Sequence, residues 1–183
     1  HIITLGSCSK IDNAIVEPYD NEKDVLLAWT QFIQKLDPDI ITGYNIFGFD
    51  FSFMWNRAEE LECIDDFSKL GRINIIDKKT DVATVKKSRL EIKKLASSAL
   101  GDNVLKYISM DGRIVMDLFK IVQKDFNLVS YKLDYVSEYF INDNIVSIDK
   151  YKLKVKGVDT LLKGNFITIS YGNDDKYKNR SVV

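Results

Sequence analysis

Asp50 stands where its carboxylate could bind a metal ion. It follows an apolar run at Ile40–Thr42 and a turn, and it opens an amphipathic segment that favours a helix. Such a connection places the side chain at the carboxyl end of a strand, where open α/β sheets bind ligands. With one histidine and two distant cysteines in the sequence, a catalytic metal would be held by carboxylate oxygens, which suit Mg²⁺. The alternative is that Asp50 caps the helix.

The elements that would position Asp50 follow from hydrophobic spacing. Asp37-Pro38 ends one amphipathic segment, because proline cannot continue a helix. Apolar strands that alternate with amphipathic helices predict an α/β fold. The predicted elements are a strand at 2–5, a helix that ends before Asp37, a strand at 40–42, a helix that begins at 49 or 50, a strand at 113–116, a helix at 118–126 and a short helix at 131–140.

Two regions depart from this alternation. Between about residues 71 and 110, the short apolar runs Ile73–Ile76 and Leu90–Leu95 are separated by a lysine-rich stretch, which predicts a protruding hairpin. After Asn142, alternating and β-branched runs predict a β-rich segment over 145–183.

Composition narrows the class of protein. The 183 residues are 45% hydrophobic and 29% charged, which fits one globular domain and excludes disordered and collagen-like chains. A net charge of -1 favours neither presence nor absence of a nucleic-acid partner. No apolar run reaches the ~20 residues that cross a bilayer, so no membrane partner is expected. Because the chain opens at His1 in a strand-like run, we expect an excerpt of a longer protein.

The segment from Asp37 to Asp50 is the most informative. It is Asp-Pro-Asp-Ile-Ile-Thr-Gly-Tyr-Asn-Ile-Phe-Gly-Phe-Asp and resembles the second exonuclease motif of family B DNA polymerases, a strand that ends in Tyr-Asn, then three variable residues and Phe-Asp. Three further segments of this sequence resemble landmarks of that domain. They are Leu27-Ala28-Trp29, residues 111–117 and Ser130-Tyr131-Lys132-Leu133-Asp134-Tyr135-Val136. The resemblance covers about residues 1–141.

The resemblance implies a fold and a domain plan. The fold would be ribonuclease H-like, an incomplete mixed sheet flanked by helices. Residues 1–144 would be part of a 3′-to-5′ exonuclease domain, with the hairpin at about 71–110. The β-rich residues 145–183 would be an insertion of the kind found in polymerases of large eukaryotic DNA viruses.

The resemblance also implies a function. The parent would be a DNA-directed DNA polymerase of DNA replication with a proofreading 3′-to-5′ exonuclease. Asp50 would be a catalytic carboxylate and a ligand of a two-metal Mg²⁺ site. Asn45 would contact the frayed single-stranded 3′ end of a primer-template. Tyr44 and Phe49 would stack on that strand or fill the core, and core packing is favoured for both. The parent would also use deoxynucleoside triphosphates and a processivity clamp, and the excerpt alone would be inactive because one aspartate cannot hold two metals.

Two further exonuclease motifs are expected outside this sequence. The first, Asp-x-Glu on an apolar strand, is matched in letters by Asp20-Asn21-Glu22, but this polar turn is typical of a helix cap. The third, Tyr-x-x-x-Asp, is matched from Tyr107, Tyr139 and Tyr171 without the expected helical setting. The Tyr171–Asp175 segment is instead predicted to be a Gly-Asn turn.

Other charged residues are assigned structural roles. Asp117 and Arg113 could be active-site groups, but capping of a helix and ion pairing are the favoured roles for such residues. Lys78, Lys79, Lys86, Lys87, Arg89, Lys93 and Lys94 form a basic cluster, for which a solvated surface is favoured over DNA contact because acidic residues are interspersed.

Two alternative functions stay open. The fold could be a nuclease-inactive scaffold that positions DNA, which a substituted upstream Asp-x-Glu would favour. It could also be a free-standing exonuclease, in which case no polymerase motifs would follow Val183.

Overall fold

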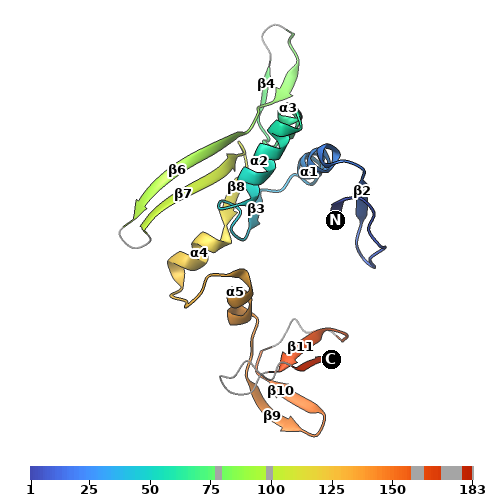
Figure 1. Ribbon diagram of the computed structural model, residues 1–183, viewed down its shortest axis with the longest axis vertical. Helices are drawn as coiled ribbons and strands as arrows, with labels where there is room; N and C mark the ends of the chain where they lie inside the picture. Colours follow the sequence, from blue (N-terminus) through green and yellow to red (C-terminus); the bar gives the residue numbers. More distant parts are fainter. Residues whose placement is uncertain (77–79, 98–100, 158–162, 170–178, 183) are drawn as a thin grey trace. The chain divides into compact units, whose positions relative to one another are not determined.

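The structure of the protein is a computed structural model that describes residues 1–76, 80–97, 101–157, 163–169 and 179–182. The chain divides into two units, His1–Tyr131 and Lys132–Val183, and each is described by itself (Figure 1).

The first unit alternates strands with helices, which confirms the mixed α/β class. Each predicted strand and helix of residues 1–67 and 113–126 is present within a few residues. Its elements are β1 (Ile2–Leu5), β2 (Val16–Tyr19), α1 (Glu22–Leu36), β3 (Ile40–Gly43), α2 (Asp50–Glu60), α3 (Ile64–Phe67), β4 (Asn74–Ile76), β5 (Ala83–Val85), β6 (Arg89–Ser97), β7 (Gly101–Ser109), β8 (Ile114–Asp117) and α4 (Leu118–Asp125).

The strands β3 and β8 form the parallel pair that positions the site. Ile40 lies opposite Ile114, and Gly43 lies opposite Asp117. A parallel pair needs a long crossover, which α2 and the segments that follow it provide. The carboxyl ends of β3 and β8 therefore lie side by side, with α2 and α4 beginning just beyond them. Each sheet in the described residues has two strands, so the larger mixed sheet that we expected is not formed within them.

A hydrophobic core holds α1, α2, α3 and β7 together. The apolar stripe of α2 predicted from the sequence supplies two of its buried members, Phe51 and Ala58. Burial of each large apolar side chain stabilises the fold by about 1.5–3 kcal/mol. The buried members are Leu26, Ile33, Phe51, Ala58, Cys63, Phe67, Leu70, Ile108 and Met110.

The described residues of the region 71–110 form two antiparallel strand pairs, where the sequence predicted one hairpin. Strand β4 pairs with β5, and the longer β6 pairs with β7. The two apolar runs used in the prediction therefore lie in different ladders. Leu90 faces Ile108, which belongs to a third apolar run that the prediction did not use. Pairing with the next segment along the chain closes a shorter loop and costs less entropy.

In its described residues, the second unit has one helix and two antiparallel strand pairs. The helix α5 (Leu133–Phe140) agrees with its prediction. The expected strands of the β-rich segment correspond to β9 (Ile145–Asp149), β10 (Lys152–Val155) and β11 (Phe166–Ile169), and β12 (Asn179–Val182) pairs with β11. The predicted turn at Tyr171–Asp175 lies outside the described residues.

Among the described residues, none of the helices combines the length and the apolar character needed to cross a bilayer.

Candidate active site

The loop between β3 and α2 is a tight turn built around Asn45. Asn45 adopts a left-handed backbone, with φ 61°. Its carbonyl oxygen accepts hydrogen bonds from Gly48 N at 3.0 Å and Phe49 N at 3.1 Å. A Cβ on Gly48 would lie 2.3 Å from Asn45 Oδ1, so glycine at this position lets the Asn45 side chain lie close against the backbone. The loop therefore has one compact conformation that leads directly into α2.

Asp117 holds this loop from the neighbouring strand. Its side chain is 3% exposed. Its Oδ1 accepts from Asn45 N at 2.7 Å and from Phe119 N at 3.0 Å, and its Oδ2 accepts from Phe47 N at 2.9 Å. The bond to Phe119 confirms the predicted helix cap, here of α4. The bonds to the loop were not predicted, because no local pattern links residues so far apart in the sequence.

Asp50 is the first residue of α2 and does not cap it. The N-cap position is Phe49, and no side chain caps this helix, so the capping alternative for Asp50 is wrong. The Asp50 side chain is exposed. It makes no hydrogen bond or ion pair with any other described residue. Its oxygens are therefore available to a ligand at the carboxyl end of β3.

The aromatic residues of the motif differ in exposure. Phe49 is 60% exposed and stacks on Phe53, with ring centroids 5.5 Å apart and planes 16° apart. Phe53 is 49% exposed, so both rings are open to solvent, and the core packing favoured for Phe49 is wrong. Asn45 is half-buried.

Tyr44 is bound within an aromatic cluster. Its hydroxyl donates to Tyr131 O at 2.5 Å, and its ring meets Phe119 edge to face at 5.5 Å. Burial raises the pKa of Tyr44, and the negative charge of Asp117 adds to the shift. The hydroxyl of Tyr44 is thus used within the protein.

The amino-terminal end of the strand pair carries an ion-pair cluster. Arg113, whose side chain is 2% exposed, lies 2.8 Å from Asp37 Oδ1 and donates to Leu70 O and Pro38 O. Arg72 Nε lies 2.6 Å from the same Asp37 oxygen. Hydrogen bonds from Arg72 and then from Arg113 lower the pKa of Asp37. The predicted ion-pair role of Arg113 is confirmed.

The residues that match the other exonuclease motifs by type alone also have structural roles. Asn21 caps α1 by accepting from Asp24 N at 2.9 Å. Glu22 pairs with Arg57 at 2.6 Å, and the hydrogen bond from Arg57 lowers the pKa of Glu22. Asp20-Asn21-Glu22 is therefore a helix start, as predicted.

Tyr107 and Asp111 are likewise used within the fold. The Tyr107 hydroxyl donates to Glu91 at 2.8 Å, and Asp111 pairs with Lys86 at 2.5 Å.

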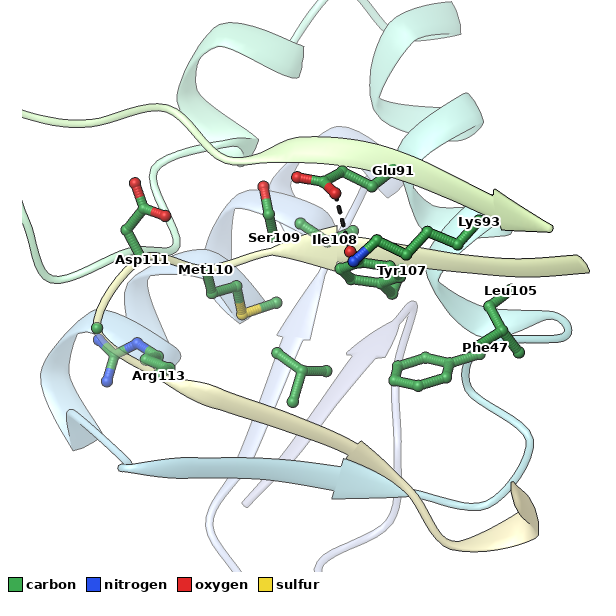
Figure 2. A pocket seen from close by; sticks show the side chains of 12 residues that line it. Phe47, Glu91, Lys93, Leu105, Tyr107, Ile108, Ser109, Met110, Asp111 and Arg113 are labelled. Atoms are coloured by element: carbon green, nitrogen blue, oxygen red, sulfur yellow. Dashed lines mark hydrogen bonds between the residues drawn. The ribbon is translucent and has the colours of Figure 1, made fainter. Parts of the chain in front are cut away.

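An open groove of about 630 Å³ lies between the β6–β7 hairpin and β8. Figure 2 shows the Tyr107 hydroxyl bonded to Glu91, with Phe47 and Leu105 at the same end of the groove. Lys93 Nζ lies 5.2 Å from the centre of the Tyr107 ring. Asp50 does not line this groove, so the groove and the candidate active site are different surfaces.

The basic cluster is partly neutralised by carboxylates. Lys87 pairs with Asp65 at 2.5 Å, as Lys86 does with Asp111. Lys78 and Lys79 lie outside the described residues.

Metal-ligand chemistry fits Asp50 only in part. Its carboxylate is of the type that Mg²⁺ binds. However, the described part of the chain contains no group of three or more His, Cys, Asp or Glu side chains that could hold a metal ion. These residues alone do not form a two-metal centre.

Comparison with known proteins identifies one matching family. A family model described as "DNA polymerase family B, exonuclease domain" matches residues 1–136.

Individual relatives agree with this match. A DNA polymerase of Pyramimonas orientalis virus is 38% identical over 170 residues, which cover 93% of this chain and 13% of that polymerase. The DNA polymerase delta catalytic subunit of Dictyostelium discoideum is 41% identical over 143 residues, 78% of this chain and 12% of the subunit. A DNA polymerase of Phaeocystis pouchetii virus is 42% identical over 159 residues, 81% of this chain and 15% of that protein. The chain thus spans less than a sixth of the length of these relatives.

Proposed function

The chain belongs to the family B DNA polymerases through their exonuclease domain, and we propose that it carries part of a proofreading 3′-to-5′ exonuclease within a longer DNA-directed DNA polymerase. The parent protein would act in DNA replication. Its substrates would be a primer-template with a frayed 3′ end and deoxynucleoside triphosphates, and a processivity clamp would be a partner.

The observation that carries the proposal is the setting of Asp50. Its carboxylate is exposed at the carboxyl end of β3, it does not cap α2, and no described residue pairs with it. A carboxylate that the fold leaves unused at this end of a parallel strand pair is suited to a ligand. We assign Asp50 as a catalytic residue and a metal ligand.

The metal would be Mg²⁺ in a two-ion site. When bound, such ions activate a water molecule and stabilise the charge on the attacked phosphate. Asp50 would hold part of this site, and other segments of the parent polymerase would supply the remaining ligands. By itself this excerpt is therefore proposed to be inactive.

The frayed strand would lie along the loop and the first turn of α2. Phe49 and Phe53 offer a stacked, half-exposed aromatic surface, on which a base can stack at about 1–3 kcal/mol per base. Asn45 would contact the sugar or phosphate. The contribution of Tyr44 would be limited to its ring, because its hydroxyl is bonded to Tyr131.

The proposed fold and domain plan follow the same family. Residues 1–144 would be part of a ribonuclease H-like domain, and 145–183 an insertion of viral polymerases. An alignment that covers 93% of the chain must include most of residues 145–183, and it is with a viral polymerase. The delta subunit of Dictyostelium discoideum aligns with 78% of the chain.

Substitution of Asp50 in the full-length polymerase tests the function. We expect Asp50→Ala and Asp50→Asn to slow degradation of single-stranded DNA about 1,000-fold, since a metal ligand contributes several kcal/mol, and to leave primer extension unchanged. Asp125→Ala, at the exposed end of α4, is the matched control.

Two results would contradict this assignment. Full nuclease activity in the Asp50→Ala protein would remove Asp50 from the reaction. A wild-type polymerase that extends primers but degrades no DNA would favour the alternative in which the domain is a scaffold that positions DNA.

A further inference from the structure

We propose that Asp117 is a positioning residue of the exonuclease site, because its buried carboxylate fixes the loop that places Asp50. This inference rests on the proposed nuclease function. Asp117 would touch neither DNA nor metal, and it would act through Asn45 and Phe47.

The carboxylate of Asp117 bonds to the segments that follow both parallel strands. The register places Asp117, the last residue of β8, opposite Gly43, the last residue of β3. From there Asp117 Oδ1 accepts from the loop at Asn45 N and from α4 at Phe119 N, while Oδ2 accepts from the loop at Phe47 N. Both carboxylate oxygens are therefore occupied by backbone N–H groups, and two of the three bonds go to the β3–α2 loop.

The loop passes this constraint to the start of α2. Asn45 O accepts from Gly48 N and Phe49 N, and Ile46 O accepts from Phe51 N at 3.2 Å. Asp50 lies between Phe49 and Phe51, whose backbone N–H groups are both bonded to the loop. A shift of Asn45 or Ile46 would thus be transmitted to Asp50. Misplacement of a catalytic group by about 1 Å can cost about 100-fold in rate.

Helix capping alone does not account for this arrangement. A cap needs one side-chain oxygen, and Asn21 caps α1 with the single oxygen of an amide. Asp117 uses its second oxygen, Oδ2, only for Phe47 N. Because the side chain is 3% exposed and bonded to three N–H groups, it is not available as a ligand for DNA or Mg²⁺.

Graded substitutions in the full-length polymerase separate capping from loop positioning. In Asp117→Ser, the side chain retains an oxygen that can cap α4, but this side chain is too short to bond to the loop as well. Asp117→Asn can keep the bonds of Oδ1 and places an amide donor against Phe47 N–H. We expect kcat for degradation of single-stranded DNA to fall about 100-fold in Asp117→Ser and about tenfold in Asp117→Asn. KM and primer extension should stay near the wild-type values.

Asn21→Ala is the matched control, because it removes the cap of α1 without touching the loop. We expect its nuclease turnover to match the wild type. An unchanged kcat in Asp117→Ser would overturn the inference. Equal losses of nuclease activity and primer extension would also overturn it, since they would show a general effect on folding.

Hydrogen exchange keeps this inference separate from the proposed function. Peptides that cover residues 43–50 should exchange faster in Asp117→Ser than in the wild type. In Asn21→Ala the same peptides should exchange at the wild-type rate. If the wild-type polymerase degrades no DNA, the proposed function fails, and this exchange still decides whether Asp117 fixes the loop. Unchanged exchange in Asp117→Ser would show that it does not.

Discussion

The two ends of the β3–β8 pair use their charged residues in different ways. At the amino-terminal end, Asp37 pairs with Arg72 and Arg113, Arg72 also pairs with Asp39, and the Arg113 side chain is almost completely buried. At the carboxyl end, Asp117 is buried against backbone N–H groups, while Asp50 is exposed and unpaired among the described residues.

The difference shows how the fold selects one carboxylate for a ligand. Both Asp50 and Asp117 lie where a strand gives way to a helix. Asp117 occupies the N-cap, so its oxygens turn toward backbone N–H groups. Asp50 lies one position later in its helix, and its side chain accepts no hydrogen bond from the helix N–H groups. One residue of helix register thus separates a structural aspartate from an available one.

The largest expected contrast in stability is between Arg113→Ala and Asp50→Ala. Arg113→Ala should destabilise the strand pair by about 3 kcal/mol, because it removes the buried donor from two carbonyl groups, Leu70 O and Pro38 O, while exposed Asp37 keeps its bond to Arg72. Asp50→Ala should change stability by less than about 0.5 kcal/mol, since surface substitutions rarely do more. Hydrogen exchange of the β3 and β8 amides in the full-length polymerase measures both. Similar values for the two variants would remove the contrast.

Gly48→Ala should have a smaller effect on stability, at the carboxyl end of the strand pair. The added Cβ would meet Asn45 Oδ1 at 2.3 Å, so the Asn45 side chain must move, at a cost of about 1–2 kcal/mol. We expect weaker protection of the loop amides and slower nuclease turnover. Gly157→Ala is the control, because its Cβ would meet no atom within 4 Å. Equal behaviour of the two variants would show that the loop tolerates another conformation.

The ion pairs of Asp37 predict a dependence on pH at the amino-terminal end. Because the folded state lowers the pKa of Asp37, its contribution is present above the unfolded pKa and is lost as the pH falls through the folded pKa. We expect the wild type to be slightly more stable than Asp37→Asn at neutral pH, and the two to converge below about pH 4. Thermal unfolding between pH 2 and 7 measures this, and parallel curves would argue against the pairing.

The smallest effect is expected for the basic cluster. Lys86 and Lys87 already pair with Asp111 and Asp65, so Lys86→Ala with Lys87→Ala should leave the salt dependence of DNA binding unchanged. Titration of DNA binding at several salt concentrations is the measurement. A slope reduced by about two units would show instead that both lysines contact phosphates.

Much of the fold could be predicted from local patterns. The Asp37-Pro38 stop, the apolar run at Ile40–Thr42 and the stripe on α2 were enough to place β3 and α2, because each depends on neighbouring residues. The hairpins over 71–110 could not be assigned in the same way. Their pairing depends on competition among several short apolar runs of similar character, which local spacing does not resolve.

The sequence by itself determined the family motif, the position of Asp50 after a strand and the lack of a histidine-based metal site. It did so because these depend on residue types and on short spacings. Tertiary structure alone decided that Asp117 binds the β3–α2 loop, that Tyr44 donates to Tyr131 and that Asp50 pairs with none of the residues that the structure describes. The two hydrogen bonds join groups far apart in the sequence, and the parallel register of β3 and β8 is what brings Asp117 to the β3–α2 loop.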